Sequence, residues 1–192
     1  MEPKEYLDIL AVAARLKNTD RHCWITPDRK ESVADHSWRI ALMAMLLEGE
    51  EEFHDVDISK VIRMCLIHDL GEAFTGDIPT FIKNEGNEKT EEKLYDAWVD
   101  SFTEPQRTQW KELLMEMNAL ETREAKLYKA MDKLEALISH NESDINTWLP
   151  LEYDLQLTYG QENMKFSPYL IRLRKVIDQW TEDKINEHNN KK

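Results

Sequence analysis

Apolar residues recur at intervals of three and four along nearly the whole chain, which is the spacing of one face of an α-helix. Two clear examples are the rows His36, Ile40, Met43, Leu47 and Leu170, Leu173, Ile177, Trp180. The chain has only 5 Gly and 6 Pro among its 192 residues, which is too few for a fold of many strands and tight turns. The pattern therefore predicts an all-α fold, a bundle of six or more helices.

The periodic segments divide the chain into helices and connecting loops. Helices are predicted at 6–17, from Ser32 or Asp35, at 58–70, 88–102, 105–117 and 121–140, from Pro150 or Leu151, and from Ser167. Loops are expected at 18–31, 49–57, 75–87 and 141–150. No repeat or change of composition marks a linker, so residues 1–185 are expected to form one domain. The polar residues 186–192 are expected to form a frayed tail.

The charge of the chain excludes several kinds of partner. Its formal net charge of −13 at pH 7 does not suit nucleic acid or anionic membranes, which require a basic surface. There is no apolar run long enough for a membrane span, no apolar signal core at the N-terminus, and no cysteine framework. We therefore expect a cytoplasmic protein that binds neither nucleic acid nor membrane. An anionic substrate would require a bound metal or a local basic pocket.

Four polar residues interrupt the apolar faces of three predicted helices: His36, His68, Asp69 and Asp132. A buried carboxylate is costly unless it is paired or binds a metal. Two imidazoles with two carboxylates suit one divalent transition metal, such as Mn, Co, Fe, Ni or Zn, and leave open positions for water and substrate. Taken singly, each residue has another explanation: a hydrogen-bonded core histidine, or an ion pair of Asp132 with Lys129 or Lys133.

The order of four motifs is more specific than any one of them. They are ESVADHS at 31–37, HDLGE at 68–72, TGDIPT at 75–80 and AMD at 130–132. Together they resemble the HD-domain superfamily of metal-dependent phosphohydrolases. The HDxxE and TGDxPT motifs resemble its 5′-nucleotidase branch, which acts on deoxyribonucleoside monophosphates. The resemblance, which covers residues 21–135, implies an HD-type helical bundle with His36, His68, Asp69 and Asp132 as metal ligands. It also implies a phosphomonoesterase that uses a metal-activated water.

The resemblance also suggests two catalytic carboxyls. Glu72 would orient the attacking water or act as a general acid or base. Its offsets from His68 and Asp69 place all three on one helix face, provided that the helix continues for another turn. Asp77 follows a glycine that permits a sharp turn, and it would contact water or the sugar in the active site.

Two cations are the candidates for substrate binding. Arg21 corresponds to an arginine that contacts the substrate in the family, and Lys83 follows the TGDIPT motif. Both could bind a phosphate oxygen. The next residue, His22, stands where the family has a tryptophan, so the resemblance does not choose between deoxyribose and ribose.

Three alternative functions stay open from the sequence. The site could act on another nucleotide, such as a triphosphate or an alarmone. The domain could bind nucleotides without catalysis, or it could be a helical scaffold with fortuitous histidines. Because the family tends to dimerise, a homodimer is also expected. The row from Leu170 to Trp180 could form either the partner face or part of the core.

Overall fold

The computed structural model describes residues 1–191 and confirms the all-α fold class. Its α-helices are α1 Pro3–Ala13, α2 Val33–Met45, α3 Ile58–Ile67, α4 Glu72–Thr75, α5 Glu85–Asp100, α6 Gln106–Ala119, α7 Arg123–Glu142, α8 Glu152–Thr158, α9 Gln161–Met164 and α10 Pro168–Asn190. Short 3₁₀ helices lie at Ala14–Asn18, Glu51–Phe53 and Ile145–Thr147. Two strands, β1 Asp20–Thr26 and β2 Arg29–Ser32, form an antiparallel hairpin.

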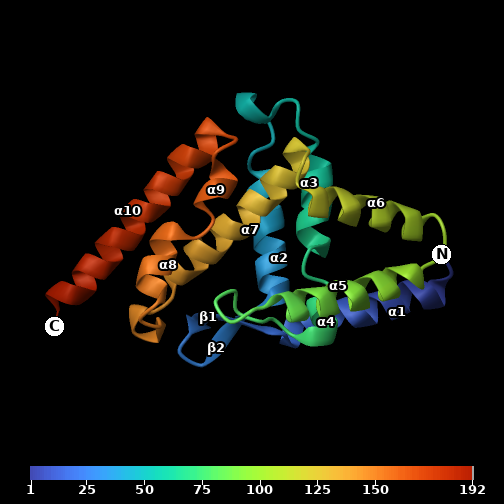
Figure 1. Ribbon diagram of the computed structural model, residues 1–192, viewed down its shortest axis with the longest axis horizontal. Coiled ribbons are helices and arrows are strands. Elements are labelled where there is room, and N and C mark those ends of the chain that lie inside the picture. Colours follow the sequence, from blue (N-terminus) through green and yellow to red (C-terminus); the bar gives the residue numbers. More distant parts are fainter. Residues whose placement is uncertain (192) are drawn as a thin grey trace.

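The centre of the fold is formed by α2, α3 and α7, which pack against one another (Figure 1). Each contributes fully buried apolar side chains, such as Ile40, Met64 and Leu134. Burying one side chain of this size stabilises a fold by roughly 1.5–3 kcal/mol. These three helices also carry the four predicted metal ligands or lead directly into them, so the best-packed part of the molecule supports the candidate site.

The C-terminal helices cover one side of this centre. Helix α10 packs against α7, α8 and α9. In Figure 1 it lies at the edge of the molecule, on the same side as α8 and α9. Leu170 and Ile177 of the predicted apolar row are buried in the core, while Trp180 is 40% exposed. Most of this row therefore packs within its own chain.

Local sequence signals fix the helix starts near the site. Ser32 caps α2: its hydroxyl accepts from the Asp35 backbone N–H, and the Asp35 carboxylate accepts from the Ser32 N–H in return. The side chain of Asp57 caps α3 by accepting from the Lys60 N–H. Such caps satisfy backbone donors that the first helical turn leaves free. The Ser32 start agrees with the sequence prediction.

The predicted loop at 18–31 is wrong, because these residues form the β1–β2 hairpin. Trp24 pairs with Lys30, and only Pro27 and Asp28 connect the two strands. Pro and Asp are common turn residues, and Trp24, Ile25 and Thr26 have high strand propensity, so a hairpin signal was present. Because the neighbouring residues are mostly polar, the apolar–polar alternation that is typical of a half-buried strand is not visible in the sequence.

Two helix ends also differ from the prediction. Helix α3 ends at Ile67 instead of Leu70, and a turn over 68–71 separates it from α4. Glu72 therefore does not share a helix face with His68, as a continuous helix would require. The predicted frayed tail is helical through Asn190, and its last residue, Lys192, lies outside the described residues. Among residues 1–191, no helix is both long and apolar enough to span a bilayer.

Candidate metal and substrate site

The two histidines are held so that one nitrogen of each ring faces the same point. His36 lies in α2 and is fully buried, and its Nδ1 bonds to the carboxylate of Glu135 in α7. His68 follows the last residue of α3, and its Nδ1 lies 2.9 Å from the carbonyl oxygen of Cys65. A carbonyl only accepts hydrogen bonds, so Nδ1 of His68 carries the hydrogen and Nε2 keeps a lone pair. The Glu135 carboxylate favours the same tautomer in His36.

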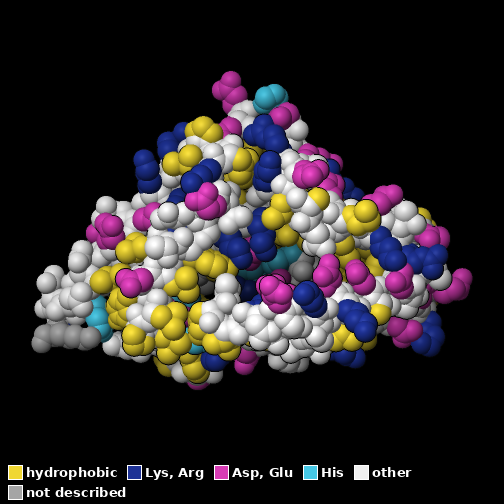
Figure 2. Space-filling model, in the orientation of Figure 1, with side chains coloured by type: hydrophobic (Ala, Val, Ile, Leu, Met, Phe, Trp, Pro, Cys, Tyr) yellow, Lys and Arg dark blue, Asp and Glu magenta, His cyan; other side chains and the backbone are white. Residues whose placement is uncertain are grey.

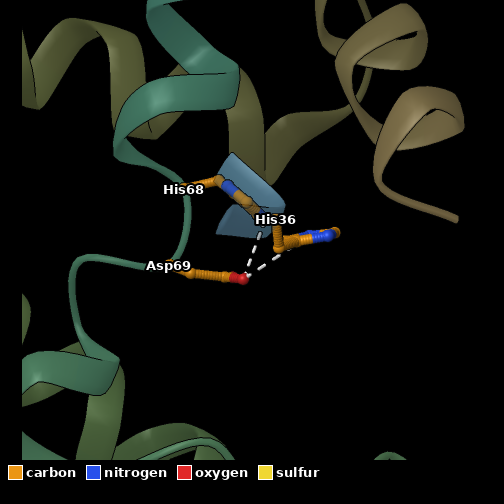
Figure 3. A group of neighbouring side chains, drawn as sticks. All are labelled: His36, His68 and Asp69. Carbon is orange, nitrogen blue, oxygen red and sulfur yellow. Dashed lines mark ion pairs between the residues drawn. The ribbon is translucent and has the colours of Figure 1, made fainter. Parts of the chain in front are cut away.

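Two carboxylates approach these Nε2 atoms. Asp69 Oδ2 lies 2.9 Å from His68 Nε2 and 3.9 Å from His36 Nε2. Figure 3 shows the Asp69 carboxylate directed toward both histidines, from the turn that follows α3. Asp132 Oδ1, from α7, lies 3.3 Å from His36 Nε2 and 3.9 Å from His68 Nε2. The structure thus brings the four predicted ligands together around one point.

The donor atoms fit a divalent cation. Both Nε2 atoms are buried and have no aligned hydrogen-bond partner among the described residues. Donor atoms of His36, His68 and Asp69 all lie within 4.8 Å of one another, and Asp132 adds a second carboxylate. A buried, unpartnered imidazole nitrogen is costly unless something binds it. Two such nitrogens beside two carboxylates provide the ligand set that first-row transition metals accept.

A neighbouring group of donors, Glu31, His36 and Glu135, is less suited to a cation. The Ser139 hydroxyl lies 2.6 Å from a Glu31 oxygen and 2.7 Å from a Glu135 oxygen, and it can donate its single hydrogen to either. Glu31 also accepts from Arg21 at 3.0 Å, and Glu135 accepts from His36. Each carboxylate therefore already has a partner within the protein. Glu135 orients the His36 ring, and Glu31 pairs with Arg21 beside it.

A cavity of about 290 Å³ opens beside the two carboxylates of the predicted ligand set, Asp69 and Asp132. Figure 2 shows Lys and Arg side chains gathered around a central hollow in which a histidine is visible, on a face that is otherwise rich in acidic residues. The pocket lining includes Arg21, His22, Asp69, Glu72, Asp77, Phe81, Lys83, Lys129, Asp132, Lys133, His140, Glu152 and Tyr159. This volume is close to the lower end of the roughly 300–1,000 Å³ of small-molecule sites.

Both predicted catalytic carboxyls line this pocket. Glu72 is buried, and its Oε2 has no hydrogen-bond partner within the described chain. Burial and the negative charges of Asp69 and Asp77 raise the pKa of Glu72 to about 11. Asp77 follows Gly76, whose φ of 77° makes the sharp turn expected at this glycine. Burial also raises the pKa of Asp77, and the positive charge of Arg21 opposes this rise.

The predicted substrate cations, Arg21 and Lys83, also line the pocket but already have carboxylate partners. Arg21 Nε donates to Glu31 at 3.0 Å, and its Nη1 lies 3.6 Å from Asp69 Oδ2. Lys83 Nζ donates to Glu91 at 2.8 Å. The half-buried Lys83 is therefore not a solvated surface lysine, although much of its charge is offset.

Another part of the pocket wall is formed by His22, His140 and the buried Glu152. His140 follows Asp132 by eight residues on α7, which is about 12 Å along the helix axis. Both histidines place Nε2 near Glu152 Oε1, His22 at 3.1 Å and His140 at 3.0 Å. The His22 ring also packs edge-on against Phe81, with 5.5 Å between ring centroids. The residue that departs from the family pattern thus lies in the pocket wall, away from the metal ligands.

Sequence reasoning gave no role to Glu135 and Glu31. It named Lys129 and Lys133 only as alternative ion-pair partners of Asp132, and the structure shows both contacts. Glu135 and Glu31 lie behind His36, while Lys129 and Lys133 line the pocket beside Asp132. Glu135 follows Asp132 by one helical turn, which was the available signal. Its contact with His36, 99 residues earlier in the chain, depends on the packing of α2 against α7.

Comparison with known proteins gives the family. The sequence matches the HD domain family over residues 13–174, most of the chain. The chain belongs to the HD domain family. This result confirms the resemblance seen in the four motifs. Like its relatives in that family of phosphohydrolases, this HD domain is a metal-dependent enzyme.

Individual relatives agree with this assignment. This HD domain is 31% identical over 150 residues to the 5′-deoxynucleotidase HDDC2 of Dictyostelium discoideum, covering 71% of the chain and 76% of that protein. It is 29% identical to human 5′-deoxynucleotidase HDDC2, covering 72% of the chain and 68% of that protein. Its fold matches a Magnetospirillum magnetotacticum protein described as a predicted metal-dependent phosphohydrolase, with a TM-score of 0.77, 28% identity and coverage of 94% and 93%. The homodimer and the cytoplasmic location stay predictions.

Proposed function

We propose that this HD domain hydrolyses nucleoside 5′-monophosphates to nucleoside and phosphate, with deoxyribonucleotides as its main substrates. One observation carries the proposal: two buried, unpartnered imidazole nitrogens and two carboxylates meet beside a pocket lined with cations. The names of the relatives support the substrate class. The Asp132 ion pair alone does not explain the site, since its other oxygen faces both histidines.

Two imidazole nitrogens and two carboxylates indicate which kind of cation this site binds. His36, His68, Asp69 and Asp132 would hold one divalent transition metal, with Mn, Co, Fe, Ni and Zn as candidates. When bound, such a metal lowers the pKa of water and neutralises charge on phosphoryl oxygens. Glu135 and the Cys65 carbonyl fix the two histidines in the tautomer that leaves Nε2 free to coordinate.

The two catalytic carboxyls have distinct positions. The buried Oε2 of Glu72 has no hydrogen-bond partner among residues 1–191, and Glu72 lines the pocket. Because its pKa is high, the Glu72 carboxyl holds a proton that it can give to the departing 5′ oxygen. Asp77, on the turn after Gly76, lines the same pocket and binds the sugar or water next to Glu72.

The pocket favours a monophosphate over a triphosphate. Its volume of about 290 Å³ is small, and its lining includes the acidic residues Glu31, Glu88 and Glu152 in addition to the carboxyls already named. A triphosphate adds two charged phosphates, which these acidic groups would repel. An alarmone adds charge in the same way. This balance supports the 5′-nucleotidase reaction over the two alternative substrate classes.

A substrate panel tests the proposal. Purified protein, stripped with chelator and reloaded with Mn, Co or Zn, is incubated with ribo- and deoxyribonucleoside mono- and triphosphates. The expected product is inorganic phosphate from the monophosphates, with higher kcat/KM for the deoxy compounds. Release of pyrophosphate or tripolyphosphate would instead assign a different phosphohydrolase reaction. Tight nucleotide binding without turnover in any metal would support the non-catalytic alternative.

A further inference from the structure

Two lysines of α7 lie on the pocket wall next to the predicted metal ligands. Lys129 Nζ is 2.9 Å from Asp132 Oδ2, and Lys133 Nζ is 3.4 Å from the same oxygen. Residues four apart on a helix lie on the same face, so both ammonium groups can reach one region of the pocket. The second oxygen of Asp132 faces His36 and His68. A single carboxylate therefore connects the lysine pair to the metal site.

Together, the two lysines have fewer carboxylate partners at ion-pair distance than Arg21 and Lys83 have. Arg21 is matched by Glu31 and Asp69, and Lys83 is matched by Glu91. Lys129 and Lys133, in contrast, share the single carboxylate of Asp132. A cation bound at Oδ1 would use part of that same negative charge. Of the cations compared in the pocket lining, the two lysines beside Asp132 are thus the best placed to bind an anion.

Lys133 is held in place by its neighbours. Its Nζ donates to the Tyr159 hydroxyl at 2.6 Å and lies 4.7 Å from the centroid of that ring. Gly160, with φ of +70°, packs so closely that a Cβ there would lie 2.7 Å from the Lys133 Cβ. Contacts of this kind reduce the entropy that a long side chain loses when it binds a ligand. Lys133 is therefore pre-positioned at the pocket.

We propose that Lys129 and Lys133 bind the phosphoryl oxygens of the substrate and of the phosphate product. This inference rests on the proposed function and identifies the phosphate end of its site. An ammonium group has three donors. Lys129 uses one donor on Asp132, while Lys133 divides its donors between Asp132 and Tyr159. Each lysine keeps at least one donor for a phosphoryl oxygen. The part of the pocket wall formed by His22, His140 and Glu152 is left for the nucleoside.

The test measures phosphate binding without turnover. Inorganic phosphate is titrated by calorimetry into Mn-loaded wild type, Lys129→Met and Lys133→Met. Methionine keeps an apolar stem of similar length and removes the charge. Each substitution is expected to weaken phosphate binding roughly tenfold to hundredfold, the usual effect of losing a hydrogen bond between charged groups. The matched control is Lys126→Met: Lys126 is an exposed lysine of α7 outside the pocket, and it should stay within about twofold of wild type.

If Lys129 and Lys133 only neutralise the negative charge of Asp132, the result should differ. In that case phosphate affinity would be unchanged in both methionine variants while Mn affinity changed, and the inference would be overturned. Lys133→Arg, which restores the charge, should recover most of the phosphate affinity. If a methionine variant does not fold, Lys129→Gln and Lys133→Gln provide the same measurement. If the methionine variants lose phosphate binding while the wild type hydrolyses no monophosphate, the proposed function is rejected and the inference that the two lysines bind phosphate is kept.

Discussion

The Nδ1 of His36 bonds to the buried carboxylate of Glu135, which fixes the opposite nitrogen of that ring toward Asp69 and Asp132. The two residues are 99 positions apart, on α2 and α7. Their contact links the packing of the helical core to the metal site. Similar carboxylate–histidine pairs in metalloproteins orient the ring and raise its affinity for the metal.

Replacing Glu135 with Gln should weaken metal binding without removing a ligand. An amide can accept the His36 hydrogen, but it lacks the charge that makes the imidazole a better donor to the metal. We expect Mn affinity to fall roughly 10–100-fold, measured by calorimetric titration. The matched control is Glu142→Gln, since Glu142 is exposed on the same helix and pairs with Arg39. Equal Mn affinity in Glu135→Gln and wild type would show that this contact does not tune the site.

Glu72→Gln should separate chemistry from binding. The glutamine keeps the shape of the side chain but cannot give a proton to the departing oxygen. We expect kcat to fall by about 10²–10⁴ while Mn affinity and phosphate affinity are unchanged. Glu88→Gln, at an exposed acid of the pocket rim, should have little effect on kcat. A rise in KM without a change in kcat would instead make Glu72 a binding residue.

The contribution of Glu152 to stability should depend on pH. Burial opposes its charge, but the hydrogen bonds from His140 and from the Leu149 N–H win and lower the pKa of this carboxyl below 4.5. A carboxyl with a depressed folded-state pKa stabilises the fold above its unfolded pKa, and this stability is lost as pH falls through the folded value. Glu152→Gln should therefore cost about 1.5–3 kcal/mol at pH 7 and less below about pH 4.5. Urea unfolding in chelator at both pH values measures the difference, and an equal cost at both would contradict this account.

The four candidate ligands stand out in the sequence because they interrupt apolar helix faces, and the resemblance of the ordered motifs to the HD-domain family singled them out as one set. The sequence also predicted the start of α2, because Ser32 and Asp35 form a capping pair that is local in the chain. It did not predict the β1–β2 hairpin, because polar residues there hide the strand pattern. It also did not predict the end of α3 at Ile67, because the helical spacing of apolar residues continues to Leu70. Glu135 was missed, and Lys129 and Lys133 were named only as ion-pair partners of Asp132, for a different reason. Charged residues on a helix are usually solvated, and only the packing of α7 against its neighbours directs these toward the site.

His36, His68, Asp69 and Asp132 together form the proposed metal site of a phosphatase. The most direct test of this site is phosphate release from a deoxyribonucleoside monophosphate after chelation and reloading, in wild type and Asp69→Ala. The matched control is Asp96→Ala, since Asp96 is an exposed acid of α5. We predict that stripped wild type is inactive, that Mn or Co restores it and Asp96→Ala, and that Asp69→Ala stays inactive in every metal. Full activity in stripped wild type or in Asp69→Ala would contradict the account.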